Sequence, residues 1–445
     1  MRCGEPLYGQ KLFGNVTLSY TRYRFRTGTS GTFVNDQETL ESSRRFLSGI
    51  YDLGLKAGFE YFVGPGYKLK FGANSIYHTF KPGATRSRTR TNGQSTLDNE
   101  FGNRDVLAWE NAGYMEHEIR LGDRIQTNLG FRTSVYHVNG GDYASWEPRI
   151  LASYLLTEDM SVKAAYSRMQ QNVHLLTNSG IGFPTDLWVP ATDGVAPQRS
   201  QQWSIGMARS LDHGIYELSA EAYYKSMRNL IEYKEGATFL GTSSNWENLV
   251  EGDGDGTSYG LELLLQKKEG RTTGWIGYTW SRTDRQFDNI NGGKAFPYRY
   301  DRRHDASVVV THQLKEHIDV AATWVYGTGS AFTLPIGKYD IIDESSFYGD
   351  GTSEVFIYGE RNANRMRAFH KLDVGIHFRK KKKWGERSWN LSIYNLYARQ
   401  NPYFYFVDEE VQQDRQGNNI GEPRTFIAQQ SLFPILPSVG YSFRF

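Results

Sequence analysis

A run of charged residues at Arg299–Asp305 is the densest group of side chains that could do chemistry. Within it, Arg302, Arg303 and His304 are candidate contacts for an anionic ligand, because a guanidinium can pair with a carboxylate or phosphate through two parallel hydrogen bonds. Alternating aspartate and arginine can also form a cross-strand ladder that fixes the end of a strand. The residue types favour this structural role, and ligand contact remains the alternative.

Aromatic side chains in polar stretches form a second group of candidates. Trp188, Trp246 and Tyr298 can stack on a sugar ring or on the apolar part of a small ligand. Further aromatic residues share this setting: Phe183, Phe239, Phe287, Phe347 and Tyr348. The same side chains can instead pack the polar stretches against one another. Residue type does not choose between ligand contact and packing.

The sequence offers little for metal binding or catalysis. The acidic stretch 251–257 fails as a calcium loop, because Ser258 stands where an EF-hand needs glycine and Leu264 where it needs a bidentate glutamate. We expect a solvated loop there. No His-Glu-x-x-His, Gly-x-Ser-x-Gly or phosphate-loop motif occurs, and the single cysteine, Cys3, cannot form an internal disulfide or a zinc site. We therefore expect no metal site, no cofactor and no enzymatic activity.

The elements that must position these candidates are long β-strands. In the segments 51–61, 276–281 and 372–379, apolar or aromatic residues take every second position and polar residues or glycine lie between them. A period of two places the two sets on opposite faces of a strand. Soluble strands are usually about five or six residues long, whereas a tilted membrane-spanning strand needs about 9–11. Strand length favours a membrane-spanning sheet over a soluble, half-buried one.

The connections between the strands alternate in length, and about sixteen strands can be counted. Short polar turns are predicted at 64–66, 122–123, 157–159, 212–214, 268–270, 315–316 and 380–385. Long polar connections are predicted at 28–43, 81–104, 171–198, 228–256, 284–301, 329–366 and 409–422, and the short turn 139–142 is an exception. Short turns at one rim and long loops at the other are typical of an all-β, antiparallel transmembrane barrel with its short turns in the periplasm.

Composition agrees with such a barrel and excludes other classes. Of 445 residues 39% are hydrophobic, the mean hydropathy is −0.58 and no run of 18 apolar residues exists, which excludes membrane-spanning helices. Aromatic residues make up 14%, which suits two interfacial girdles. A net charge of +2 gives no reason to expect nucleic acid as a partner. No flexible linker divides the chain, so we expect residues 1–445 to form a single domain.

From about residue 143 the chain resembles the TonB-dependent outer-membrane receptors of the Bacteroidetes type. The resemblance includes Trp-Glu-Pro-Arg at 146–149 and Tyr-Asn-Leu-Tyr at 394–397. The remaining matching stretches are 171–176, 184–190, 259–262, 274–281, 296–305, 398–403 and 431–439. No single motif decides the match, and it is the order and spacing of these stretches that make it specific. The residues before this point fit by strand pattern alone.

The resemblance implies a plugged barrel of about 22 strands. In such receptors a signal sequence, a segment that engages TonB, a plug domain and the first barrel strands precede the residues matched here, and the sequence shows none of them. We therefore expect the chain to be the C-terminal part of the barrel, with about 16 of about 22 strands and with the plug domain and N-terminal extension absent.

By this resemblance the chain belongs in the outer membrane of a Gram-negative bacterium, as part of a transporter that takes up a scarce extracellular ligand. The family implies a siderophore, cobalamin or an oligosaccharide as the ligand. The implied partners are outer-membrane lipid, the barrel-assembly machinery and, through the missing N-terminal part, the TonB complex. The residues leave two alternatives open: a passive porin of about sixteen strands, and an outer-membrane enzyme or adhesion scaffold.

The last residues predict how the barrel closes. One apolar and aromatic face is formed by Val439, Tyr441, Phe443 and Phe445. The terminal phenylalanine resembles the mark that the barrel-assembly machinery reads. In a complete receptor this strand is expected to pair with the first strand of the barrel, which would lie outside the chain.

Overall fold

The structure is a computed structural model that describes residues 2–3, 7–8, 11–34, 38–102, 104–178, 180, 186–237, 245–342, 352–411 and 424–445. Almost all of its regular structure is antiparallel β-sheet, with three short 3-10 segments at Asp212–Gly214 (η1), Trp246–Leu249 (η2) and Asn291–Gly293 (η3). None of the described helices is both long and apolar enough to cross a membrane. The long alternating segments of the sequence explain this architecture, because a period of two suits a strand that separates two environments.

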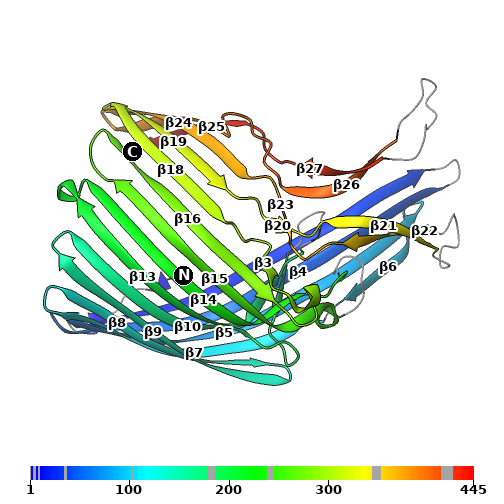
Figure 1. Cartoon of the computed structure of the whole chain (residues 1–445), viewed down its shortest axis with the longest axis horizontal. Helices are drawn as coiled ribbons and strands as arrows, with labels where there is room; N and C mark the ends of the chain where they lie inside the picture. The colour runs from blue at the N-terminus through cyan, green and yellow to red at the C-terminus, as the bar shows by residue number, and fades with distance from the viewer. Residues whose placement is uncertain are drawn as a thin grey trace.

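A wall of sixteen long strands dominates the described structure (Figure 1). In chain order its strands are β3 (Leu12–Val34), β4 (Thr39–Gly64), β5 (Tyr67–Thr91), β7 (Val106–Leu121), β8 (Ile125–Val138), β9 (Gly141–Thr157), β10 (Met160–Gln171), β13 (Gln198–Leu211), β14 (Tyr216–Tyr233), β15 (Val250–Lys267), β16 (Thr272–Gln286), β18 (His304–Lys315), β19 (Ile318–Gly327), β24 (Phe369–Lys382), β25 (Gly385–Tyr394) and β28 (Leu436–Arg444). Each strand pairs with the next in antiparallel register. Even the shortest, β28, has nine residues, which is enough for a tilted span of about 9–11.

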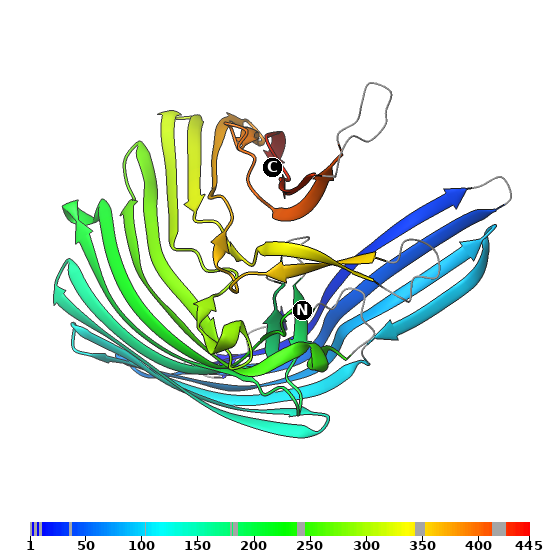
Figure 2. The same ribbon diagram turned by 45° about the vertical axis from the view of Figure 1, so that its right-hand side comes forward.

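Four short strands extend this sheet to twenty: β1 (Arg2–Cys3), β2 (Leu7–Tyr8), β6 (Gln94–Gly102) and β17 (Phe296–Pro297). β1 and β2 pair with the first residues of β3, between Leu12 and Thr17. No pairing joins β3 to β28 among the described residues. The wall is therefore curved but open, and Figure 2 shows β3 and β28 on opposite sides of the opening.

The predicted short turns are confirmed, and all seven join wall strands at one rim. The long connections are only partly loops. The ranges 28–43 and 81–104 were expected as loops, but β3 and β4 pair from Leu12 to Val34, and β5 pairs with β6 up to Thr91. Their threonine, serine and arginine residues are polar yet compatible with strands, so polarity there marks a wet hairpin rather than irregular chain. The expected loop at 251–257 likewise lies within β15.

The two faces of the wall differ as the alternation predicts. Leu53 and Leu55 on β4 are 53% and 52% exposed and lie on the convex face, whereas Asp52 and Lys56, on either side of this pair in the sequence, lie on the concave face. Ile205 on β13 is 65% exposed and likewise lies on the convex face. A continuous exposed apolar surface of this kind marks a face that meets lipid in membrane barrels.

Shorter hairpins connect the wall strands at the rim opposite the short turns. They are β11 (Val173–Leu176) with β12 (Leu187–Pro190), β20 (Ala331–Phe332) with β23 (Asn364–Arg365), β21 (Pro335–Ile342) with β22 (Thr352–Tyr358), and β26 (Phe404–Glu410) with β27 (Arg424–Gln430). The β11–β12 hairpin folds over the concave face, where it joins a buried cluster of Phe46, Leu176, Leu187, Val189, Val195, Ile231, Tyr233, Trp246 and Val250. This cluster is a small hydrophobic core inside the wall.

Candidate ligand-binding site

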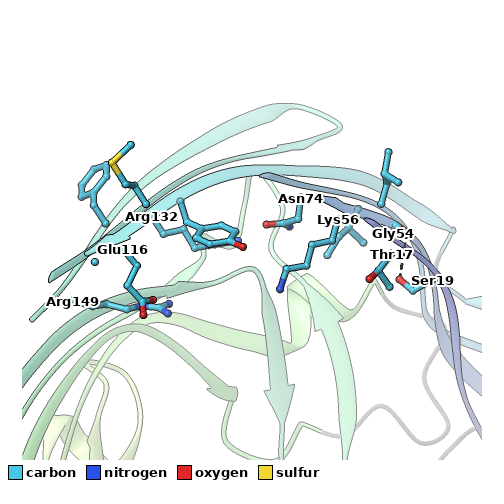
Figure 3. A pocket seen from close by; sticks show the side chains of 14 residues that line it. Thr17, Ser19, Gly54, Lys56, Asn74, Glu116, Arg132 and Arg149 are labelled. Carbon is cyan, nitrogen blue, oxygen red and sulfur yellow. Dashed lines mark hydrogen bonds between the residues drawn. The ribbon is translucent and has the colours of Figure 1, made fainter. Parts of the chain in front are cut away.

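The concave face holds a hollow of about 530 Å³ that crosses β3, β4, β5, β7, β8 and β9. Figure 3 shows Lys56 and Asn74 projecting into it from β4 and β5, with Glu116 and Arg149 on the other side. These residues come from the polar side of the alternating pattern, because odd and even positions of a strand face opposite ways. The wall thus presents hydrogen-bonding and charged groups of both signs to the space that it encloses.

Glycines make room for the ring of Tyr114, which lines this hollow. Gly72 on β5 pairs with Gly58 on β4 on one side and with Tyr114 on β7 on the other. A Cβ atom at Gly72 would lie 2.4 Å from the carbonyl oxygen of Ala57 and 2.8 Å from the hydroxyl of Tyr114. The Tyr114 ring therefore lies across two glycines, as aromatic side chains do where a strand lacks side chains of its own.

Arg132 on β8 joins two acidic residues next to the hollow. Its guanidinium donates to Oε1 of Glu147 at 2.7 Å and to Oε1 of Glu110 at 2.8 Å. Ser145 also donates to Glu147, and Asn172 donates to Glu110, both at 2.7 Å. Glu147 is 2% exposed, so its charge is stabilised by these bonds rather than by water. The hydrogen-bonding groups of Arg132 are therefore used within the wall and are not available to a ligand.

Two cations at the hollow remain accessible. The Arg149 side chain is 53% exposed, and its guanidinium lies 3.7 Å from Glu147. Lys56 is exposed, its ammonium lies 5.9 Å from the centroid of the Tyr114 ring, and it forms no ion pair with any residue that the structure describes. Lys56 and Arg149 can therefore bind an anionic or hydrogen-bond-accepting group in front of the wall. Neither was a candidate from the sequence, although the alternating pattern already placed Lys56 on the polar face.

The charged run at 299–305 lies where the long connection after β16 enters β18. Asp301 is 2% exposed, forms an ion pair with Arg303 at an N···O distance of 3.2 Å, and accepts a hydrogen bond from Arg365. The backbone N–H of Thr283 also donates to Asp301 at 2.6 Å. Arg303 thus has the structural role that the residue types favoured, and its predicted role in ligand contact stays a prediction.

Arg302 and His304, the neighbours of Arg303, are exposed. The guanidinium of Arg302 lies 3.6 Å from Asp305, with both side chains 46% exposed. His304 shares a hydrogen bond of 2.8 Å with the hydroxyl of Tyr278. Of the three charged candidates, Arg302 and His304 are therefore the ones a ligand could reach without breaking a buried ion pair.

The aromatic candidates fall into different environments. Trp246 is 2% exposed and packs in the core beneath the β11–β12 hairpin, whereas Trp188 on β12 is partly buried. Tyr298 lies under the guanidinium of Arg285, whose carbon is 3.7 Å from the centroid of the ring. Phe287 is 2% exposed and packs with other buried residues. Packing is the contact that the structure gives to Trp246, Tyr298 and Phe287. The candidates Phe183, Phe239, Phe347 and Tyr348 lie outside the described residues.

Sequence reasoning missed a buried ion-pair group near these aromatic residues. Glu232 on β14 is 1% exposed and accepts from Arg285 at 3.2 Å and from Arg361 at 2.8 Å. These three residues are far apart in the chain and share no motif, so no local signal could have joined them. The group ties β14 and β16 to the connection before β24. Among the described residues no group of three or more His, Cys, Asp or Glu side chains could hold a metal ion.

Three of the four predicted closing residues, Val439, Tyr441 and Phe443, alternate along β28. Val439, Tyr441 and Phe445 are 68%, 56% and 95% exposed, and Phe445 follows the last residue of the strand. The Tyr441 ring lies 4.8 Å from that of Trp389 on β25, and Phe443 lies 4.9 Å from Phe445, as measured between ring centroids. The free edge of β28 has no strand partner in the part of the chain that the structure describes.

The family described as "TonB dependent receptor-like, beta-barrel" matches residues 7–396. The chain belongs to this family. The match covers the wall from β2 to the end of β25, and it agrees with the antiparallel wall, its apolar outer face and its sorted turns. No curated protein matches the chain by sequence.

Solved structures of TonB-dependent receptors share the fold. The ferripyoverdine receptor of the outer membrane of Pseudomonas aeruginosa is 13% identical, with a TM-score of 0.57 over 88% of this chain and 51% of that one. The ferric preacinetobactin receptor of Acinetobacter baumannii is 14% identical, with a TM-score of 0.55 over 98% and 61%. The ferric yersiniabactin uptake receptor of Yersinia pestis is 14% identical, with a TM-score of 0.53 over 98% and 59%. The chain spans about half the length of the ferripyoverdine receptor.

Proposed function

We propose that this chain forms part of the barrel wall of an outer-membrane TonB-dependent receptor that takes up a scarce extracellular ligand. The observation that carries the proposal is the wall itself, whose apolar face points outward and whose charged and hydrogen-bonding face lines a hollow on the concave side. A wall of this kind separates lipid from a polar path. Family membership supports the role of a receptor, and we propose ligand uptake without enzymatic activity.

We further propose that the wall described here is one portion of a larger, plugged barrel. A self-contained porin of sixteen strands would need β3 to pair with β28, and no such pairing exists among the described residues. Open strand edges are very costly in lipid, because their N–H and C=O groups find no partner there. The Bacteroidetes type, the plug domain and the contact with TonB belong to this proposal.

The ligand class is proposed from the relatives. The three relatives named above are receptors for iron complexes, as their descriptions state. A ferric siderophore is therefore the first ligand class to test, followed by cobalamin and oligosaccharides. Lys56 and Arg149 on the wall, and Arg302 and His304 at its long-loop rim, are the groups that we propose for ligand contact. Trp188, partly buried on the inner hairpin, is the proposed aromatic contact.

Uptake by cells that carry the complete gene tests this function. We expect saturable accumulation of one ligand class that stops when TonB is deleted or the proton gradient is collapsed. The double variant Lys56→Gln/Arg149→Gln should weaken ligand binding, while the matched variant Lys163→Gln/Arg209→Gln, placed on other wall strands, should leave it unchanged. Passive ion conductance by the 445-residue chain in a planar bilayer, with uptake that does not depend on TonB, would support the porin instead.

A further inference from the structure

Four consecutive lysines, Lys380–Lys383, end β24 and begin the turn to β25, and strand register sorts the first three by face. Lys380 pairs with Arg387, which in turn pairs with Phe443. Directly paired residues of antiparallel strands lie on the same face of the sheet. Lys380, Lys382 and Arg387 therefore share the face of Phe443 and of the apolar residues that precede the turn. We call these three residues the basic rim patch.

The opposite face of the same turn is different. There Lys381 pairs with Glu386, which pairs with Arg444. An acidic side chain thus stands between two basic ones on the concave side. Within the part of the chain that the structure describes, no acidic side chain forms an ion pair with Lys380, Lys382 or Arg387. Positive charge is left unbalanced on the convex, outward face alone.

No other short turn has this composition. Each of the other turns at this rim that carries charge includes an acidic residue: Asp123, Glu158 and Asp159, Asp212, Glu269, and Glu316. Glu316, in the neighbouring turn, is exposed and forms no ion pair with the patch in the described structure. The basic rim patch is therefore a local feature and not the general chemistry of the rim.

Exposed aromatic side chains border the patch on its apolar side. Trp384 at the turn is 73% exposed, and its ring centroid lies 5.5 Å from that of Phe443. Trp389 is 45% exposed, and its ring packs at a tilt against that of Tyr441, with the ring centroids 4.8 Å apart. Tryptophan and tyrosine at the end of an apolar surface mark the depth of lipid headgroups, and lysine side chains next to them can extend to the phosphates.

We propose that the basic rim patch binds the anionic headgroup of a glycerophospholipid in the membrane leaflet at the short-turn rim. The proposal rests on the membrane-spanning wall of the proposed function. The chemistry is that of two ammonium groups and one guanidinium around a phosphodiester, at the boundary between an apolar aromatic surface and water. Such a site would fix the position of the C-terminal strands β24, β25 and β28 in the membrane.

Fluorescence quenching tests this binding next to Trp384. The 445-residue chain is folded in mixed detergent–lipid micelles with phosphatidylglycerol or phosphatidylcholine brominated on the acyl chains, at equal mole fractions. The difference between the chain and its Trp384→Phe variant reports quenching at Trp384. We expect phosphatidylglycerol to be preferred over phosphatidylcholine. Lys380→Gln/Lys382→Gln should reduce this preference roughly tenfold or more, because each basic residue near an anionic surface contributes about fivefold.

The interleaved variant Lys381→Gln/Lys383→Gln is the control, because it removes the same charge from the same turn. It should keep most of the preference. Equal loss in both variants would show that net charge alone attracts the lipid and would overturn the site. Equal quenching by both lipids in the unaltered chain would overturn it as well, while leaving the membrane wall intact. Absence of quenching by either lipid in a folded chain would instead contradict the lipid-facing wall and the proposed function.

Discussion

At the scale of single residues, the wall contains charged side chains held in buried ion pairs and charged side chains that remain exposed. Arg132 lies between Glu110 and Glu147 and is bonded to both, whereas Arg149 on the next strand is half exposed. Both are arginines on the polar side of a strand pattern, so they look alike in the sequence. Their difference is one of burial, and it decides which of them can meet a ligand.

Arg132→Met should strongly destabilise the wall. The substitution removes the guanidinium that is hydrogen-bonded to both Glu147, at 2% exposure, and Glu110, and it leaves only the half-exposed Arg149 at 3.7 Å from Glu147. Removing one partner of a buried ion pair typically costs about 3–5 kcal/mol. Urea unfolding of the chain in detergent micelles, followed by tryptophan fluorescence, measures the loss. Arg149→Met is the matched control and should change the free energy of unfolding by less than about 1 kcal/mol. Similar effects of the two substitutions would contradict the assigned roles.

At the scale of elements, the β11–β12 hairpin closes over the concave face through a small core. His174 on β11 is fully buried, and Gln198 shares a hydrogen bond of 2.9 Å with its Nδ1 atom. Burial lowers the pKa of His174 to about 4, so the folded hairpin holds a neutral imidazole. The stability of the folded hairpin should therefore depend on pH.

The hairpin should loosen as the pH falls from about 6.5 to about 4. In this window an opened hairpin binds a proton at His174 and the closed hairpin does not. The free energy that holds the hairpin closed is therefore complete above the pKa of an unfolded histidine, about 6.5, and declines by up to about 3 kcal/mol as the pH falls to about 4. Hydrogen exchange of the β11 and β12 amides measures it. His174→Gln, which cannot take up a proton, should make the exchange nearly independent of pH over this window, and an unchanged dependence would assign it to another group.

A substitution at Phe445 tests barrel assembly and the stability of the folded chain separately. Phe445 is 95% exposed and lies beyond the end of β28, so Phe445→Ser should leave the urea midpoint of the folded chain unchanged. If the barrel-assembly machinery reads this residue, the same variant of the complete gene product should reach the outer membrane in smaller amounts. Fractionation of cells followed by immunoblotting gives that amount. Normal assembly of the variant would remove Phe445 from the proposed assembly signal.

At the scale of the whole molecule, the wall curves but does not close. β1 and β2 pair with only the first residues of β3, and the free edge of β28 has no partner in the described structure (Figures 1 and 2). Two long edges would leave many backbone N–H and C=O groups without hydrogen bonds in a bilayer, at several kcal/mol for each group. A detergent micelle is less demanding, because water and detergent headgroups can reach the edges.

The 445-residue chain should therefore not form a stable monomer in lipid nanodiscs. We expect it to aggregate, or to associate through its edges, when detergent is removed. Size-exclusion chromatography with light scattering and a test for heat-modifiable migration on gels measure the outcome. A version that also carries the first strands of the proposed larger barrel is the control and should give a monomer. A folded, heat-modifiable monomer of the shorter chain would contradict the open-wall interpretation.

The sequence by itself determined the strands, their faces and the sorting of short turns to one rim, because a period of two and the residues of tight turns are local properties. Only the tertiary structure decided the features that depend on contacts between residues far apart in the chain. Curvature brings Arg365 to Asp301, and the hairpin that folds inward buries Trp246. Polar composition alone could not show that 28–34 and 39–43 continue as paired strands, since polar residues suit a wet hairpin as well as a loop. Lys56 and Arg149 became site residues only when six strands placed them around one hollow.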